Sequence, residues 1–456
     1  MPSKEWRWLM RKNGLKKKAG MILTGGLLLS SVLPSMVLTS CNSVIHYGEY
    51  RKEYKLAELE QIKENSFLPL NEIPYPDTDL KEGSVSQDYV SALKDFTYQV
   101  SKAQDSFSYA PLNLYNVLDT ICHGAKEDIQ EKLNTLLGLD KEKRLEEYHH
   151  LYPLDFYQND QGILQMFESM YFQNGFEVSP DFLSSLTSRY AEAYQTDLQD
   201  EESQKRICSW VDEKTAEKDY VSPRDLGIEK DTCALLLSTL HFEGKWFSKY
   251  IHDNTYQENF YTKENEVREI MYMKHTAFGE VYDYGSYYSV YDRYQNGEKI
   301  QFLISKDRRE NTFDLIKDVN FYKESEDKEE LVRDPIVVSL SVPKFDVSAS
   351  TDFLPVLDKL GLSKLSDETC RPLNSMFTNL MKDDSVYLSM LKQKNRISFT
   401  EDGTTFKSLT SGGFGNKSTA YMDTLELRLD HPFVYTVYDR FGLPIYTSRL
   451  EDFDRI

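Results

Sequence analysis

The fold is decided by a stretch near the C-terminus that reads Arg396-Ile397-Ser398-Phe399-Thr400-Glu401-Asp402-Gly403-Thr404-Thr405. Its first half, up to Thr400, has the alternation of apolar residues that is typical of a β-strand. The next predicted strand begins only near Leu425 or His431. A connection of this length within a compact domain is usually functional or disordered. Residues 401–419 are therefore predicted to form either a functional loop or a disordered surface loop.

The middle of this segment offers a bond that a protease could cut, between Lys417 and Ser418. Trypsin-like proteases take a basic side chain into their specificity pocket, so they cleave after lysine or arginine. Three glycines precede this bond, at positions 412, 413 and 415, and favour an exposed chain. The pattern predicts a bait for such a protease.

Upstream, helical and strand-like patterns alternate along the chain. Helices are predicted over residues 86–103, 113–137 (interrupted at Gly124), 179–194, 207–217 and 353–360, and strands over 163–172, 233–242, 336–342, 431–438 and 443–450. Helices dominate early and strands late, which predicts an α+β fold with one large mixed core.

Composition excludes several classes of protein. The chain has 456 residues, of which 40% are hydrophobic and 28% charged, so it is globular. Its net charge of −20 argues against a nucleic-acid partner, because phosphate requires a basic face. Neither a Gly-x-Ser-x-Gly elbow nor a His-Glu-x-x-His motif occurs, so no enzyme activity is predicted. No cofactor or metal site is predicted either, and Cys122, Cys208, Cys233 and Cys370 are expected to be free thiols.

The N-terminus has the plan of an export signal. A basic region at residues 11–18 precedes a stretch, 19–38, that carries no charged side chain. The stretch ends in Leu38-Thr39-Ser40-Cys41, which resembles the bacterial lipoprotein signal, in which the cysteine is lipidated. We therefore expect residues 1–40 to be a signal peptide and Cys41 to anchor the protein in a membrane of the bacterial cell envelope, facing the periplasm or the outside. A retained transmembrane anchor is the alternative.

Residues 41–85 are predicted to be a tether that follows the lipidated cysteine. A Lys/Glu-rich run at 51–64 and the prolines at 69, 74 and 76 discourage a packed core. From Ser86 to the C-terminus the alternating pattern predicts the folded domain, residues 86–456.

Five segments in order resemble the serpin family, across about residues 87–454. They are residues 207–215, which resemble its Ile-Asn-x-Trp-Val helix; 240–246, with Phe-x-Gly-x-Trp; 342–362, with Pro-Lys-Phe and a following Leu-Gly helix; 401–404, the Glu-Glu-Gly-Thr hinge; and Asp430-His431-Pro432-Phe433. The resemblance implies a serpin-like fold, in which helices surround a large central mixed β-sheet and a reactive-centre loop is exposed.

The resemblance also implies a function, the suicide inhibition of a serine protease or a cysteine protease. In the family the cut loop inserts into the central sheet as a new strand. The implied hinge is Glu401, Asp402, Gly403 and Thr404, and the bond fourteen residues after the hinge glycine is Lys417–Ser418. Bonds after Phe414 or Tyr421 remain alternatives. The protein is expected to be a monomer, and its partner a trypsin-like serine protease.

Two departures from the family pattern favour a function other than protease inhibition. Phe406 stands where inhibitory hinges have small residues, so insertion is expected to be slower. The family's polar positions near the sheet opening are here Ala110, Asn113, Ser238 and Gln393, so its usual network is replaced. The alternative prediction is a non-inhibitory serpin that acts as a binding module or as a protease substrate.

Overall fold

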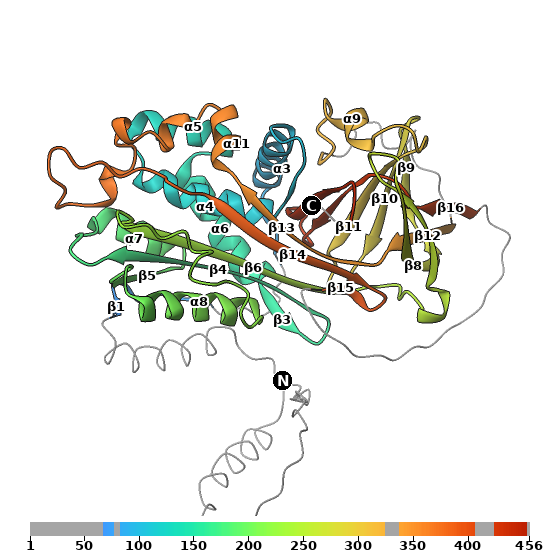
Figure 1. Ribbon diagram of the computed structural model, residues 1–456, viewed down its shortest axis with the longest axis horizontal. Helices are drawn as coiled ribbons and strands as arrows, with labels where there is room; N and C mark the ends of the chain where they lie inside the picture. The colour runs from blue at the N-terminus through green and yellow to red at the C-terminus, as the bar shows by residue number, and fades with distance from the viewer. Residues whose placement is uncertain (1–66, 77–82, 324–336, 406–423, 454–456) are drawn as a thin grey trace, which may run out of the picture. The chain divides into compact units, whose positions relative to one another are not determined.

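The computed structural model describes residues 67–76, 83–323, 337–405 and 424–453, all within the unit Ser43–Ile456 (Figure 1). The predicted signal segment 1–40, Cys41, Phe406, Lys417 and Ser418 lie outside the described residues. Within the described ranges, no helix combines the length and apolar composition needed to cross a bilayer.

A helix lies within each range where the sequence predicts one, but the helices at 141–155 and 312–316 were not predicted, and the helix predicted from 207 begins at Glu201. They are α3 (Gln87–Lys102), α4 (Pro111–Gly124), α5 (Glu127–Leu137), α6 (Lys141–Asp155), α7 (Pro180–Ser188), α8 (Glu201–Thr215), α9 (Thr312–Ile316) and α11 (Leu354–Lys359), with short 3-10 turns η2 (His252–Asn254), η3 (Ser363–Leu365), η4 (Glu368–Cys370) and η5 (Asn374–Met376). Ser86 caps α3, because its side chain accepts a hydrogen bond from the amide of Tyr89. Gly138 ends α5 in the left-handed conformation that glycine adopts without strain.

The strands form three sheets. The central eight-stranded sheet has the order β1 (Leu68–Pro69), β5 (Ala191–Thr196), β4 (Gly162–Gln173), β6 (Ala234–Lys245), β15 (Gly403–Thr405), β14 (Lys392–Thr400) and β13 (Phe345–Asp352), with β3 (Tyr157–Asn159) paired to β4. A six-stranded sheet has the order β2 (Ser108–Tyr109), β18 (Pro444–Leu450), β17 (Phe433–Tyr438), β11 (Lys299–Ser305), β10 (Tyr287–Arg293) and β9 (Glu280–Asp283). A four-stranded sheet has the order β16 (Thr424–Arg428), β12 (Val337–Pro343), β8 (Val267–Phe278) and β7 (Tyr256–Tyr261). The central sheet is mixed, since β4 and β5 run parallel and its other pairs antiparallel.

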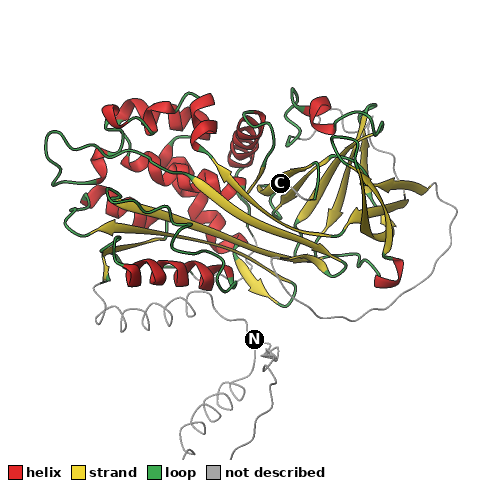
Figure 2. Cartoon of the chain, in the orientation of Figure 1, coloured by secondary structure: helices red, strands yellow, loops and turns green. Residues whose placement is uncertain are grey.

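Helices cover both faces of the central sheet (Figures 1 and 2). On β4, Met170 and Phe172 join the main core with α4, whereas Tyr171 between them joins a second cluster with Ile207 of α8. Successive side chains of a strand point to opposite faces, so α4 and α8 lie on opposite sides of the sheet. The predicted α+β class with a large mixed core is confirmed.

Two expectations from the sequence need correction. Residues 67–76 were expected in the tether, but Leu68–Pro69 pair with β5 and Phe67 is buried in the second cluster, so the packed part starts upstream of Ser86. The helix predicted over 179–194 stops at Ser188, and residues 191–196 form β5 instead. Pairing with β4 and with β1 outweighs the local helical pattern there.

The cysteines of the described part carry no disulfide. Cys122 and Cys208 are buried, whereas Cys233 and Cys370 are partly exposed, and all four are free thiols.

Candidate functional site

The centre of the central sheet is held together by a strand of only three residues. Among the described residues β6 and β14 do not pair with each other, and β15 stands between them. Thr404 pairs with Gly244 of β6 on one side and with Phe399 of β14 on the other. Beyond β15, no strand among the residues that the structure describes pairs with the facing edges of β6 and β14, and such edges are templates for a further strand.

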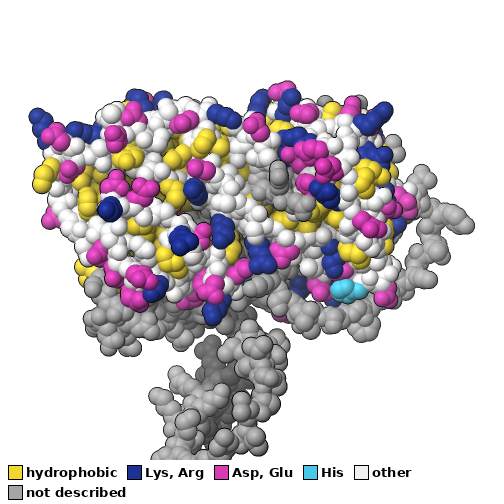
Figure 3. Space-filling model, viewed as in Figure 1, with side chains coloured by type: hydrophobic (Ala, Val, Ile, Leu, Met, Phe, Trp, Pro, Cys, Tyr) yellow, Lys and Arg dark blue, Asp and Glu magenta, His cyan; other side chains and the backbone are white. Residues whose placement is uncertain are grey.

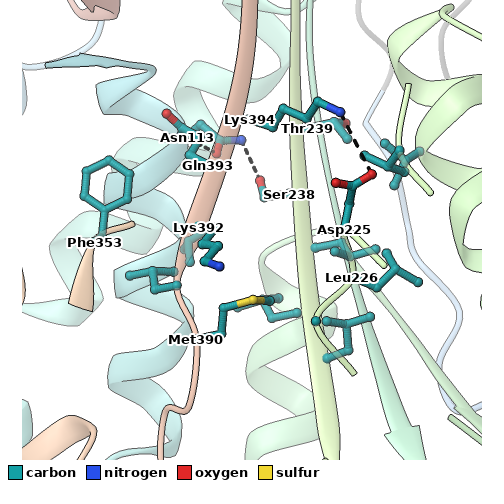
Figure 4. A pocket seen from close by; sticks show the side chains of 18 of the residues that line it. Asn113, Asp225, Leu226, Ser238, Thr239, Phe353, Met390, Lys392, Gln393 and Lys394 are labelled. Carbon is teal, nitrogen blue, oxygen red and sulfur yellow. Dashed lines mark hydrogen bonds and ion pairs between the residues drawn. The ribbon is translucent and has the colours of Figure 1, made fainter. Parts of the chain in front are cut away.

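A cavity of about 420 Å³ occupies this gap (Figure 4). Its apolar lining comes from the leucines at 236, 237 and 240 of β6 and from Phe353, Met390 and Leu391 on the opposite side. The cavity lies between the two strands that β15 joins, so an extended segment that enters it would continue β15.

A buried carboxylate fixes the turn from β14 to β15. Glu401 is only 2% exposed and accepts hydrogen bonds from the Lys344 ammonium at 2.9 Å and the Thr255 hydroxyl at 2.7 Å. Burial raises the pKa of Glu401, but these two hydrogen bonds, a backbone hydrogen bond and the charge of Lys344 together outweigh it and lower the pKa to about 2. The His252 ring lies 3.4 Å from the same carboxylate. The turn is thus held by an ion pair that forms only in the folded protein.

A tryptophan and a tyrosine also contact the turn between β14 and β15. The Trp246 indole donates a hydrogen bond to the carbonyl of Thr400 at 2.8 Å, and its backbone amide bonds the carbonyl of Asp402. The Tyr294 ring stacks on Trp246 at 4.7 Å between ring centroids, and its hydroxyl lies 2.5 Å from the Thr404 hydroxyl.

A polar bridge crosses the gap where the sequence departs from the family pattern (Figure 4). Asn113 of α4 donates a hydrogen bond to the Ser238 hydroxyl of β6 at 2.7 Å, and Gln393 of β14 donates one to the Asn113 carbonyl at 3.1 Å. Gln393 also accepts from the backbone amide of Ala110 at 2.6 Å. These four residues therefore form a different network, which ties β6 and β14 to α4.

A segment after α8 also reaches across the gap to β14. The Tyr220 hydroxyl donates a hydrogen bond to the backbone carbonyl of Lys394. The Lys394 ammonium in turn donates one to the backbone carbonyl of Tyr220, and both distances are 2.9 Å. Further along β14, Arg396 pairs with Glu217 of the same segment.

The predicted hinge residues thus lie together, because Glu401 and Asp402 form the turn and Gly403 and Thr404 belong to β15. Sequence reasoning missed Tyr294, Thr255 and His252 as neighbours of this turn. They come from other sheets and loops, and no motif in the sequence marks them.

Comparison with known proteins agrees with this geometry. The model of a family described as "Serpin (serine protease inhibitor)" matches residues 92–450. Neuroserpin of Gallus gallus is 26% identical over 377 residues, which cover 77% of this chain and 87% of that protein. The crystal structure of Tengpin, a thermophilic serpin, in its native state matches with a TM-score of 0.71 at 18% identity, over 84% of this chain and 100% of that one. Human thyroxine-binding globulin complexed with thyroxine matches with a TM-score of 0.66 at 17% identity, over 80% and 98%.

The family model covers well over half of the residues, and the described sheets and helices are those of the same fold. The chain belongs to the serpin family.

Proposed function

We propose that this protein is a serpin-type suicide inhibitor of a trypsin-like serine protease, with Lys417–Ser418 as its bait. The observation that carries the proposal is the open gap between β6 and β14, which β15 has already entered at one end. In the sequence, the segment that follows Gly403–Thr405 leads directly to the bait residues.

The chemistry is supplied by the target enzyme. Its serine hydroxyl attacks the Lys417 carbonyl carbon, the Lys417–Ser418 amide bond breaks, and the new amino terminus at Ser418 leaves with a proton. The segment up to Lys417 is then tethered to the protease by an ester, and its insertion beside β6 and β14 carries the protease away before water hydrolyses that ester. The inhibitor needs no catalytic residue, metal or cofactor of its own.

The register of β15 predicts where Phe406 must go. Two residues on from Thr404, the positions on β6 and β14 that a continued strand would pair with are Phe242 and Ile397, both buried. Because side chains alternate along a strand, Phe406 would face the same interior as Thr404 once the loop is inserted. Inserting a large ring into packed surroundings typically costs about 1–3 kcal/mol. Insertion therefore competes less favourably with hydrolysis of the ester than it would if position 406 held a small residue.

The second candidate is a non-inhibitory serpin that acts as a binding module or a protease substrate. The apolar cavity of about 420 Å³ favours it, since its size suits a ligand. Among related folds, thyroxine-binding globulin is complexed with thyroxine.

One experiment separates the two functions. The soluble chain from residue 67 onward is mixed with trypsin and examined on a denaturing gel and by mass spectrometry. We expect a covalent complex and a released fragment that begins at Ser418. Clean cleavage after Lys417 that leaves trypsin fully active would reject the inhibitor and favour the second candidate.

We also propose that Cys41 carries the lipid that anchors the protein in the bacterial envelope. The support for this proposal is the sequence, in which a basic region and an uncharged stretch precede Leu38-Thr39-Ser40-Cys41. On the face of the described part shown in Figure 3, acidic, basic and hydrophobic side chains are interspersed. Expression in a bacterial host should give a membrane-bound protein whose Cys41→Ala variant is released from the membrane. Equal membrane binding of both forms would favour a retained transmembrane anchor.

A further inference from the structure

The hinge strand is already docked in the resting protein. All three residues of β15, Gly403–Thr405, pair with β6 and β14 at once. Thr404 is only 1% exposed, and its hydroxyl lies 2.5 Å from that of Tyr294. Tyr294 comes from the turn after β10, in another sheet, so the contact joins two distant parts of the chain.

Tyr294 is itself held rigidly. Its side chain is 1% exposed and lies between Trp246, which stacks on it, and Phe242, which meets it edge-on at 5.3 Å. Its backbone amide bonds the carbonyl of Glu298 at 2.9 Å. Since the ring cannot swing away, its hydroxyl stays at the position where Thr404 docks.

Two glycines make room for the docked strand. A Cβ on Gly403 would lie 2.2 Å from the carbonyl oxygen of Gly244, and a Cβ on Gly244 would lie 2.5 Å from the Phe242 ring and 2.7 Å from the Tyr294 ring. No side chain larger than hydrogen fits at either position. The two backbones and the Tyr294 ring are thus fitted to one another around Thr404.

We propose that Tyr294 and Thr404 form a hinge clamp, which keeps the first residues of the inserting strand docked so that insertion grows from a preformed nucleus. Bringing distant strands together costs closure entropy before hydrogen bonds repay it. With the first three residues in place, each later residue adds to an existing ladder. The clamp therefore offsets the slower entry of Phe406. This role rests on the proposed inhibitory function.

The clamp predicts how single hydroxyl groups affect inhibition. Losing one neutral hydrogen bond changes a two-state ratio by roughly 2- to 10-fold. Tyr294→Phe and Thr404→Val each remove one hydroxyl and keep the shape of the side chain. Each should raise the number of inhibitor molecules consumed per protease inactivated by roughly 2- to 10-fold. The double variant should be no worse than either single one, because both remove the same bond.

The control is Tyr322→Phe. Tyr322 is equally buried, and its hydroxyl lies 2.7 Å from that of Ser101, away from the hinge. For this variant, the number of inhibitor molecules consumed per protease inactivated should equal that of the unmodified protein, although it also loses a buried hydrogen bond of a hydroxyl group.

A second readout needs no protease. Hydrogen exchange of the peptide 398–405, followed by mass spectrometry, reports whether β15 stays docked. We expect faster exchange in Tyr294→Phe and Thr404→Val and unchanged exchange in Tyr322→Phe. Unchanged exchange in both hinge variants would overturn the clamp. Faster exchange with unchanged stoichiometry would overturn its role as a nucleus. If the unmodified protein forms no complex at all while the hinge variants exchange faster, the inhibitory function fails and the clamp stands.

Discussion

At the scale of single residues, the ring of Phe406 is the side chain that most directly opposes insertion. Replacing it with alanine removes the overpacking expected between Phe242 and Ile397, worth about 1–3 kcal/mol. We expect that fewer molecules of the Phe406→Ala variant than of the unmodified protein are consumed per protease inactivated. Titration of trypsin activity against inhibitor concentration measures this number.

The matched control is Lys407→Ala. Position 407 faces the opposite side of a continued strand, so this variant should behave like the unmodified protein. An unchanged stoichiometry in Phe406→Ala would show that the ring does not limit insertion.

The Glu401 carboxylate makes the stability of the hinge depend on pH. Its folded-state pKa, about 2, lies below the ordinary value of 4.5, so the ion pair with Lys344 stabilises the fold above about pH 4.5 and is lost as the pH falls toward 2. We expect the free energy of unfolding of the Glu401→Gln variant to be lower than that of the unmodified protein by roughly 1–3 kcal/mol at pH 7. Urea unfolding at several pH values checks this.

The difference in the free energy of unfolding between the Glu401→Gln variant and the unmodified protein should shrink on acidification from pH 5 to pH 3. Glu426→Gln is the control, because the Glu426 side chain is 78% exposed and its pairing with Lys274 is long, at 3.6 Å. A constant difference across this range would contradict the assigned role of Glu401.

Two buried carboxylates oppose each other at Asp155 and Asp439, with 0% and 2% exposure. Burial raises the pKa of both, so the folded protein holds a proton here that the unfolded chain releases. Stability from this pair is present at low pH and is lost as the pH rises through the folded-state values. Asp155→Asn should therefore be more stable than the unmodified protein at pH 8, by about 1–3 kcal/mol, and the advantage should vanish by pH 4.

Urea unfolding at pH 4 and pH 8 tests this pair. An Asp155→Asn variant that is less stable at both pH values would show that the carboxylate is needed for its weak pairing with Arg440, whose guanidinium nitrogen lies 3.7 Å away.

At the scale of elements, α4 connects β6 and β14, the two strands between which the loop would insert in the proposed mechanism. Asn113 bonds Ser238 of β6 and accepts from Gln393 of β14. Asn113→Ala leaves both partners short of a hydrogen bond in a partly buried site, which should cost about 1–3 kcal/mol. We also expect faster spontaneous conversion to an inserted form on warming, seen as a change in mobility on a native gel.

The control for this element is Asn320→Ala. The Asn320 side-chain amide also donates a hydrogen bond to another side chain, that of Asp95 at 2.8 Å, but neither residue lines the cavity in the gap. If both variants convert at the same rate, the Asn113 bridge does not restrain the two strands.

At the scale of the whole molecule, the open gap predicts that cleavage stabilises the protein. A strand that continues β15 would form hydrogen bonds with both β6 and β14, each contributing about 1 kcal/mol net, so several together add roughly 5–10 kcal/mol. We expect loop-cleaved protein to unfold at a clearly higher temperature than intact protein in scanning calorimetry. An equal or lower unfolding temperature would mean that the gap does not take up the loop.

Much of this molecule follows from local patterns in the sequence. The helix 87–102 follows from its apolar spacing and its Ser86 cap, and the strand before Glu401 from its alternation. The hinge was predicted because Glu401-Asp402-Gly403-Thr404 resembles the serpin hinge motif, which is a short continuous stretch that can be found in the sequence alone. The strand β5 was missed because its pairing with β4 and β1 outweighs the local pattern.

The sequence by itself determined the class of fold, the order of its elements and the position of the hinge, since these depend on patterns within short windows. Only the tertiary structure decided that β15 pairs with β6, that Tyr294 meets Thr404 and that Asn113 bridges Ser238 and Gln393. These contacts join residues more than a hundred positions apart, and no local periodicity specifies them. They arise when sheets and helices pack, which is where the burial of apolar surface selects one arrangement.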